Sequence, residues 1–287
     1  VSRENEEKYQ FQMENSMKVH IVNYEEPRYN GILSKYAYSM ADELEKLGVE
    51  VTVSNEPDPK ADINHHINYR SYRPSGTIDT LMVTHITTAD KMESIKSGMK
   101  TAKKGICFSR ETEEQLKKEG IKKLTTILPA HDGLPRRPRR IFISTNVYPD
   151  GCKREGMFYE LIKNIDCSKF HFYIMGSGWN VQGLEANISY LDHFELDDYA
   201  NLMNVCDYNL YFGLDEGSMG ILDATNVGMK TIAPSTGFHK EIGIDYPFTT
   251  QLELNEIFKK LATNPVESWT WAQYTKEHMK VWEKLLS

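Results

Sequence analysis

Cysteine is scarce in the 287-residue sequence, and it forms no pattern. The four cysteines are scattered, with no CxxC pair and no Cys/His spacing suited to a metal ion: Cys107, Cys152, Cys167 and Cys206. We interpret them as reduced thiols in a cytosolic protein. A structural zinc site is not expected, and no metal ligands are assigned.

Long apolar runs are also missing. No stretch approaches the roughly 20 apolar residues that span a bilayer. Val1–Ser16 is polar, without the charged-then-apolar pattern of a leader, and we expect it to be an extension ahead of the fold. The formal net charge is −7, which gives no general attraction to nucleic acid or to an anionic membrane. We therefore expect a cytoplasmic protein without a transmembrane segment or a nucleic-acid partner. Peripheral contact with a membrane stays open, as does the oligomeric state.

What the sequence does contain is an ordinary globular composition, 40% hydrophobic and 26% charged. Apolar runs typical of buried parallel strands alternate with apolar residues at helical spacing. The predicted strands are Met17–Asn23, Val49–Val53, Ile63–Tyr69, Thr80–His85, Ile106–Phe108, Leu124–Leu128, Arg140–Ser144, Phe170–Met175, Ile188–Leu191, Tyr208–Phe212 and Lys230–Ala233. The predicted helices are Leu33–Leu47, Met92–Ala102, Glu111–Glu119, Arg154–Ile165, Asp197–Cys206, Met219–Val227, Leu252–Thr263 and Val266–Leu286.

A segment rich in proline and arginine, Pro129–Arg140, interrupts this alternation and is the best candidate for a linker. Its arginine run is typical of a solvated linker, and contact with a lipid phosphate is the alternative. The resulting division is an extension 1–16, a first domain 17–133, a linker 134–140, a second domain 141–265 and a C-terminal helix 266–287. The fold class is α/β, with two Rossmann-like doubly wound parallel-sheet domains. Because ligands of such sheets bind at the carboxyl ends of the strands, we expect a cleft between the two domains.

Three loops that lead from a strand into a helix could carry chemistry. Gly31 precedes the first helix, where a glycine lets backbone N–H groups approach an anion, although a plain turn explains it equally well. Lys153 follows the first strand of the second half at a helix start, where a cation is disfavoured unless an anion such as a phosphate is bound. A solvated surface lysine is the alternative.

The third loop, Asp215–Gly220, is the most specific of the three. The exposed amides of Ser218, Met219 and Gly220 at a helix start could hold a diphosphate. Asp223, further along the same helix, could accept hydrogen bonds from ribose hydroxyls.

This third stretch resembles the signature of GT-B glycosyltransferases, in particular the retaining family 4. That signature has an acid, a glycine-rich turn, a second acid eight positions on, then Ala and a helix-ending Gly. Asp215, Asp223, Ala224 and Gly228 match this spacing. Both acids are Asp where the family usually has Glu, and Glu216 is an alternative for the first acid.

Further positions follow the family's order along the chain. The strand ending in Gly176-Ser-Gly178 resembles the family's Gly-x-Gly, and Lys153 stands at its diphosphate-binding lysine, whereas Asn146 replaces its common arginine. His85 resembles a strand-ending histidine that faces the transferred sugar, but a lone histidine there is equally often structural. The resemblance implies His85 and Asp215 as catalytic residues and a final helix that crosses back to the first domain. The implied donor site contains Gly31, Asn146, Lys153, Gly178, Glu216, Ser218, Met219, Gly220 and Asp223.

The implied function is transfer of a sugar from a nucleotide-diphosphate sugar to an unknown acceptor, which is a glycan, a lipid-linked molecule or another compound. The resemblance implies a retaining, metal-independent reaction without a cofactor, in keeping with the absence of an Asp-x-Asp motif of the metal-dependent type. The alternatives are a GT-B-like nucleotide-sugar 2-epimerase and a non-catalytic nucleotide-sugar-binding subunit. A dehydrogenase is disfavoured because no Gly-x-Gly-x-x-Gly follows the first strand.

Overall fold

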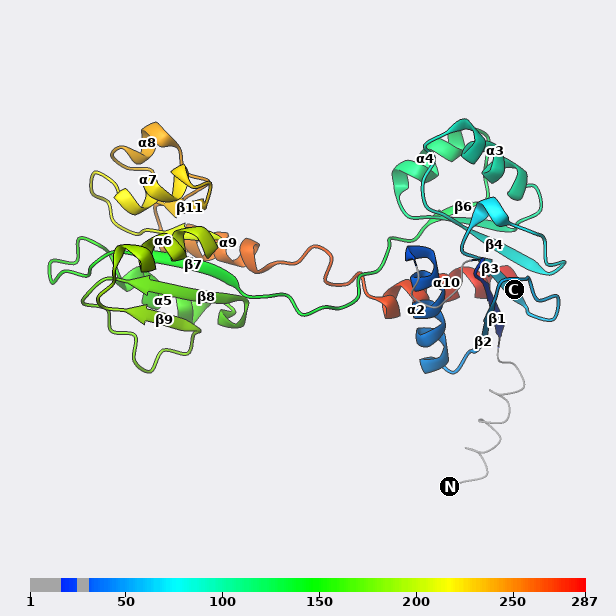
Figure 1. Ribbon diagram of the computed structural model, residues 1–287, viewed down its shortest axis with the longest axis horizontal. Helices are drawn as coiled ribbons and strands as arrows, with labels where there is room; N and C mark the ends of the chain where they lie inside the picture. Colours follow the sequence, from blue (N-terminus) through cyan, green and yellow to red (C-terminus); the bar gives the residue numbers. More distant parts are fainter. Residues whose placement is uncertain (1–16, 25–30) are drawn as a thin grey trace, which may run out of the picture. The chain divides into compact units, whose positions relative to one another are not determined.

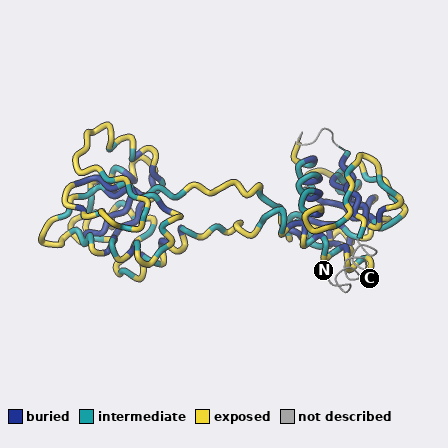
Figure 2. The backbone as a smooth tube through the Cα atoms, turned by 90° about the horizontal axis from the view of Figure 1, so that it is seen from below, coloured by how far each residue is buried: buried dark blue, intermediate teal, exposed yellow. Residues whose placement is uncertain are grey.

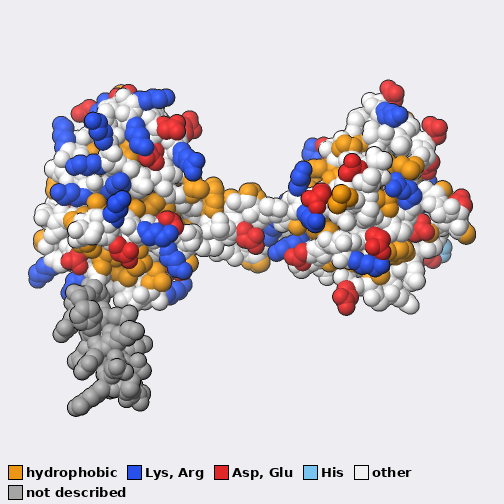
Figure 3. Space-filling model, turned by 180° about the vertical axis from the view of Figure 1, so that it is seen from behind, with side chains coloured by type: hydrophobic (Ala, Val, Ile, Leu, Met, Phe, Trp, Pro, Cys, Tyr) orange, Lys and Arg blue, Asp and Glu red, His pale blue; other side chains and the backbone are white. Residues whose placement is uncertain are grey.

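The computed structural model describes residues 17–24 and 31–287. The chain divides into two compact units. Unit 1 contains the described residues up to Leu134 together with Pro265–Ser287, and unit 2 contains Pro135–Asn264. Figure 2 shows buried residues concentrated within each unit, and Figure 3 shows charged side chains of both signs spread over the face in view. Within the described residues, no helix is long and apolar enough to cross a membrane.

Unit 1 is built on a six-stranded parallel sheet in the order β2-β1-β3-β4-β5-β6 (Figure 1). Its strands are β1 (Lys18–Val22), β2 (Glu50–Ser54), β3 (Ile63–His66), β4 (Ile78–Val83), β5 (Lys104–Cys107) and β6 (Leu124–Thr126). The first strand pairs with β2 on one side and with β3 on the other. The strand order therefore reverses between β1 and β3, which is the switch point where doubly wound sheets bind ligands.

Helices cover both faces of this sheet. They are α2 (Ile32–Lys46), α3 (Ala89–Gly98), α4 (Arg110–Lys118) and α10 (Trp271–Leu286), with a 3₁₀ turn η1 at Tyr69–Ser71. Met82 packs in one core with α2 and α10, whereas Leu81 packs in another with α3 and α4. This division follows from the alternation of side chains along a strand. Trp282 of α10 is fully buried, so the end of the chain is part of the core of unit 1.

Unit 2 repeats the design with the order β12-β11-β10-β7-β8-β9. Its strands are β7 (Arg139–Ser144), β8 (Phe170–Met175), β9 (Ile188–Leu191), β10 (Tyr208–Leu210), β11 (Lys230–Ala233) and β12 (Tyr246–Pro247). The helices are α5 (Gly156–Asn164), α6 (Leu196–Val205), α7 (Met219–Asn226), α8 (His239–Ile242) and α9 (Gln251–Ala262), with a 3₁₀ turn η2 at Cys167–Lys169. Ile141 and Ile143 face the core shared with α5 and α9, and Phe142 faces α6 and α7.

The predicted fold class is confirmed, because both sheets are wholly parallel and are interleaved with helices. The cleft between the two units stays a prediction. Several predicted element ends are wrong. Helix α5 starts at Gly156 instead of Arg154, because Arg154 has φ 54° and cannot join a right-handed helix. Helix α10 starts at Trp271 instead of Val266, where the Thr270 side chain accepts a hydrogen bond from the Gln273 N–H and caps the helix.

The boundary between the two units falls in the predicted linker, after Leu134, and Arg136 and Arg137 are exposed there but have partners within the chain. Arg137 pairs with Asp207 at 2.7 Å, and Arg136 donates to the carbonyl oxygen of Ala262 at 3.1 Å. Arg139 is the first residue of β7 and donates to the carbonyl oxygen of Leu261. These arginines tie the start of unit 2 to the end of α9, because the C-terminal carbonyls of a helix lack partners within the helix.

Candidate functional site

The predicted donor-site residues of unit 2 gather along one edge of its sheet. Strand β7 pairs with β8 on one side and with β10 on the other, so the strand order reverses between β7 and β10. The loops after these two strands carry Lys153 and Asp215. The loop after β8 carries Gly176 and Gly178. All of these loops leave the carboxyl ends of parallel strands, so they lie at the switch-point edge where such sheets bind ligands.

The loops after β7 and β8 are packed backbone against backbone. A Cβ atom added to Gly176, whose φ is 126°, would lie 2.3 Å from the Thr145 carbonyl oxygen. One added to Gly178, whose φ is 86°, would lie 2.7 Å from the Val147 carbonyl oxygen. Glycine is required at both positions, by conformation and by close approach. The Asn146 side chain fastens the same contact by accepting a hydrogen bond from the Ser177 N–H at 2.8 Å.

Lys153 joins the loop after β7 to the loop after β10. Its Nζ donates to Asp215 Oδ2 at 2.5 Å and to the Tyr211 hydroxyl at 2.9 Å, and the Tyr211 hydroxyl donates to Asp215 at 2.7 Å. The side chains of Lys153 and Asp215 are 20% and 37% exposed, so this pair is less hydrated than an ordinary surface ion pair. An ammonium group has three N–H donors, and these contacts use two of them. Lys153 therefore keeps one donor for a ligand.

The charges of this cluster are stabilised by the cluster itself. Burial alone would lower the pKa of Lys153, but its hydrogen bonds to Asp215 and Tyr211 outweigh burial and raise that pKa. Burial would raise the pKa of Asp215, but the hydrogen bonds from Lys153 and Tyr211 lower it on balance. Burial raises the pKa of Tyr211 to about 12, so its phenol stays protonated at neutral pH. The site thus presents a fixed ammonium group beside a fixed carboxylate.

The start of α7 differs from the expectation in one respect. The Ser218 N–H donates to Nε2 of the buried His239 at 2.8 Å, and the His239 Nδ1–H donates to the Pro234 carbonyl oxygen at 2.9 Å. The Ser218 amide is therefore engaged within the chain, contrary to the expectation that it is exposed. Met219 and Gly220 are the first two residues of α7, and their N–H groups have no acceptor within the helix. Of the three predicted amides, those of Met219 and Gly220 are thus the two without a helical acceptor.

The acids of the motif lie in different surroundings. Glu216 is exposed, and its backbone carbonyl accepts from the Phe238 N–H at 2.9 Å. Asp223 Oδ2 accepts a hydrogen bond from the Tyr199 hydroxyl of α6 at 2.7 Å. One carboxylate oxygen of Asp223 therefore already has a partner within the chain.

In unit 1 the structure brings Gly31 and His85 to one pocket of about 610 Å³ at the switch-point edge. His85 lies two residues beyond the end of β4, is exposed, and has Nδ1 2.9 Å from Thr84 Oγ1. Its Nε2 accepts a hydrogen bond from Lys91 Nζ at 2.7 Å. Asn30, which precedes Gly31, lies outside the described residues.

The sequence pattern did not predict three residues that contact the site: Tyr199, Tyr211 and His239. Each is an ordinary apolar or buried position in the sequence pattern, and only the fold places it against Asp223, Lys153 or Ser218. Unit 2 has a pocket of about 690 Å³ between α5 and the loop after Gly178. None of the predicted site residues lines this pocket. Within the described residues, no group of three or more His, Cys, Asp and Glu side chains could hold a metal ion.

The sequence matches no protein-family model. No curated protein matches it either. Solved structures similar to this chain include HepE of Anabaena in complex with UDP-glucose, at 12% identity over 93% of this chain and 100% of that one, with a TM-score of 0.37. The apo form of the lipopolysaccharide outer core galactosyltransferase WaaB also matches at 12% identity over 93% and 100%, with a TM-score of 0.36. The catalytic domain of starch synthase IV of Arabidopsis thaliana, bound to ADP and acarbose, matches at 12% identity over 88% and 76%, with a TM-score of 0.37. At such identities and scores, the likeness says nothing about what this chain binds.

Proposed function

We propose that this protein is a glycosyltransferase that binds a nucleotide-diphosphate sugar at the switch-point edge of unit 2. The observation that carries the proposal is the position of Lys153. Its ammonium group lies between the loops after β7 and β10, in the same set of loops that leads into the start of α7. A lysine with a spare donor and the open amides of Met219 and Gly220 are suited to a diphosphate.

The remaining donor-site residues have defined parts in this proposal. Asp223 holds the ribose with its other carboxylate oxygen, and Asn146 and Gly178 shape the wall beside the diphosphate. Asp215 lies next to the ammonium group that balances the leaving diphosphate, and Glu216 is the alternative for this acid. His85 of unit 1 contacts the transferred sugar, with the acceptor bound on the side of unit 1. The resemblance to family 4 supports the retaining outcome and the assignment to that family.

We propose that the reaction needs no metal ion, because Lys153 and the α7 amides supply the positive charge that a metal would supply to the diphosphate. Activity is therefore expected to survive EDTA. Complete loss on chelation, restored by Mg²⁺ or Mn²⁺, would show that the donor is held through a metal instead.

The test of the function begins with a thermal-shift screen of nucleotides and nucleotide sugars, since a bound ligand raises apparent stability by mass action. The stabilising nucleotide sugar is then incubated with the protein, with and without candidate acceptors, and release of the nucleoside diphosphate is measured. Release that depends on an acceptor supports the transferase. Conversion of the sugar without an acceptor indicates the epimerase, and binding without turnover indicates a non-catalytic subunit.

A further inference from the structure

The pocket of unit 1 lies where four strands end. Gly31 stands between β1 and α2, Asn68–Arg70 follow β3, Thr84–Lys91 follow β4, and Phe108 follows β5. Its volume of about 610 Å³ is within the range of pockets that hold small molecules. The pocket spans the reversal of strand order between β1 and β3, which is the preferred ligand position of this kind of sheet.

One side of the pocket is apolar and aromatic. The rings of Tyr36 and Phe108 pack with centroids 4.9 Å apart, and Tyr69 is buried beside them. Ile32 lines the same pocket and is 62% exposed, so its side chain offers apolar area to a ligand. This side can bind an apolar or aromatic group, because such rings offer a large contact area with few rotatable bonds.

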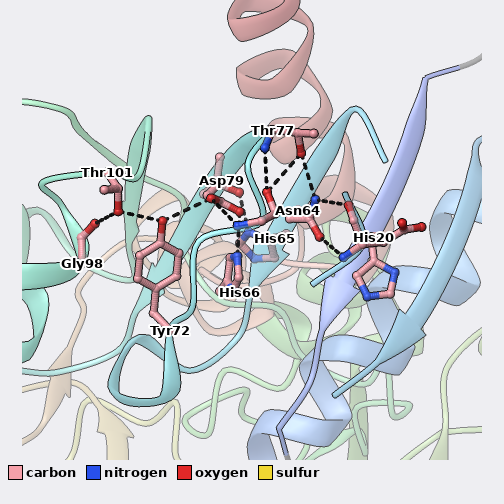
Figure 4. A network of polar contacts seen from close by, with 12 residues as sticks. His20, Asn64, His65, His66, Tyr72, Thr77, Asp79, Gly98 and Thr101 are labelled. Carbon is pink, nitrogen blue, oxygen red and sulfur yellow. Dashed lines mark hydrogen bonds and ion pairs between the residues drawn. The ribbon is translucent and has the colours of Figure 1, made fainter. Parts of the chain in front are cut away.

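The wall that follows β3 is held in place by a buried polar network, shown in Figure 4. His66 Nε2 lies 2.9 Å from Asp79 Oδ1, and the Tyr72 hydroxyl donates to Asp79 Oδ2 at 3.1 Å. Both His66 and Asp79 are buried. At the other end of the wall, the Tyr69 hydroxyl donates to the His85 carbonyl oxygen at 3.0 Å. The pocket therefore has a wall fixed on both sides, which lowers the ordering cost of binding.

The described residues that line the pocket carry a net positive charge, although the whole chain is acidic. Of the eleven described residues that line it, two are the cations Arg70 and Lys91 and none is an acid. Arg70 pairs with Asp90 at 3.2 Å. Lys91 differs, since its described contacts are to His85 Nε2 at 2.7 Å and to Thr87 Oγ1 at 2.8 Å, and neither of these is a carboxylate. Lys91 also lies in the first turn of α3, where the helix dipole disfavours a cation.

We propose that this pocket binds a small amphiphilic anion: a molecule with an apolar or aromatic body and one negatively charged group. The body lies against Ile32, Tyr36 and Phe108, and the charged group takes the open donor of Lys91. The pocket offers an aromatic wall and a cation that has no carboxylate partner among the described residues. It therefore favours a ligand with both an apolar body and a negatively charged group. That this ligand is the sugar acceptor rests on the proposed function, whereas its binding does not.

The test uses the full chain and three probes in calorimetric titrations, all below micellar concentrations. Octyl phosphate carries both parts, octyl glucoside carries the tail without the charge, and inorganic phosphate carries the charge without the tail. We expect octyl phosphate to bind more tightly than either of the others. Lys91→Gln should lower the affinity for octyl phosphate by about 10-fold or more, because a charge-assisted hydrogen bond is lost. The affinity for octyl glucoside should stay unchanged.

Two further variants locate the binding. Lys96→Gln, on the same helix but paired with Glu119 away from the pocket, should leave all three probes unchanged. Ile32→Ser should weaken the two octyl ligands to the same extent. The proposal is overturned by absence of octyl phosphate binding, by equal affinities for octyl phosphate and inorganic phosphate, or by equal effects of Lys91→Gln and Lys96→Gln. Titration with nucleoside diphosphates in parallel keeps the two proposals separate, because the proposed diphosphate binding in unit 2 should survive every one of these variants.

Discussion

Lys153→Ala removes the ammonium group that bridges the loops after β7 and β10. A charge-assisted hydrogen bond from a lysine to a phosphate contributes about 1.5–3 kcal/mol. Lys153 shares its charge with Asp215 in this structure, so we expect the lower half of that range. The affinity for a nucleoside diphosphate should then fall by about 10- to 40-fold.

The assay is calorimetric titration of the wild type and the variant with uridine, adenosine and guanosine diphosphates. Lys163→Ala is the matched control, since Lys163 is exposed on α5 and pairs with Glu160 outside the site. A thermal melt of each variant shows whether loss of the ion pair has disturbed the fold. Equal dissociation constants for wild type and Lys153→Ala, with intact folds, would refute the placement of the diphosphate at this lysine.

Asp215→Asn completes the experiment, because it keeps the shape of the side chain and removes its charge. If the diphosphate lies beside Lys153, the Asp215 carboxylate repels it and competes for the ammonium group. Diphosphate affinity should therefore stay equal or rise in Asp215→Asn, while sugar transfer falls. A loss of affinity as large as that of Lys153→Ala would mean that Asp215 only holds the lysine in position.

Three further predictions concern other parts of the chain. In urea unfolding, Gly176→Ala should destabilise unit 2 by clearly more than Gly183→Ala. Both glycines have positive φ, but only a Cβ at Gly176 would meet backbone atoms. Equal losses of unfolding free energy would show that only the backbone angle matters. Asp223→Ala should lower the donor affinity more than Asp223→Asn, and Tyr199→Phe should leave the donor affinity unchanged. If Tyr199→Phe and Asp223→Ala lowered the donor affinity equally, Asp223 would be only a contact between two helices. Burial lowers the pKa of His278 from 6.5 to about 4, so the unfolded chain binds more protons between these pH values. The stability from this neutral histidine is fully present above about pH 6.5 and is lost as the pH falls toward 4. The loss in the free energy of unfolding is on the order of 3 kcal/mol, and His278→Phe should remove it from the pH profile of urea unfolding. An unchanged profile would show that His278 is not the titrating group.

The sequence predicted the sheets well because parallel strands are buried on both faces and read as short apolar runs. β4 and β8 show this, since most of their residues are buried. The element ends were predicted less well. Thr270 caps α10 through its side chain, and the φ of Arg154 delays the start of α5, and both effects depend on local geometry that apolar spacing does not encode.

Some residues of the candidate site could be predicted from the sequence and others could not. Motif spacing placed Lys153 and Asp215 on loops that the fold brings together, because both loops follow strands that are neighbours in the sheet. The partner residues could not be predicted. Tyr211 is the first residue after β10 and belongs to the predicted apolar strand Tyr208–Phe212. His239 lies 21 positions after Ser218, at a place with no motif. Such partners become visible only when the loops are folded against one another.

His239 also limits where a diphosphate can lie. Its Nδ1–H donates to the Pro234 carbonyl oxygen, so Nε2 carries a lone pair and can bind the Ser218 amide only as an acceptor. A phosphate oxygen has no hydrogen to offer this nitrogen, so displacing the amide would leave a buried imidazole nitrogen without a partner, at a cost of about 1–3 kcal/mol. Under the proposed function, the phosphate should therefore bind the amides of Met219 and Gly220, which no helical carbonyl engages. If the proposed diphosphate binds at α7, the histidine limits its binding to the amides of the first two residues of the helix.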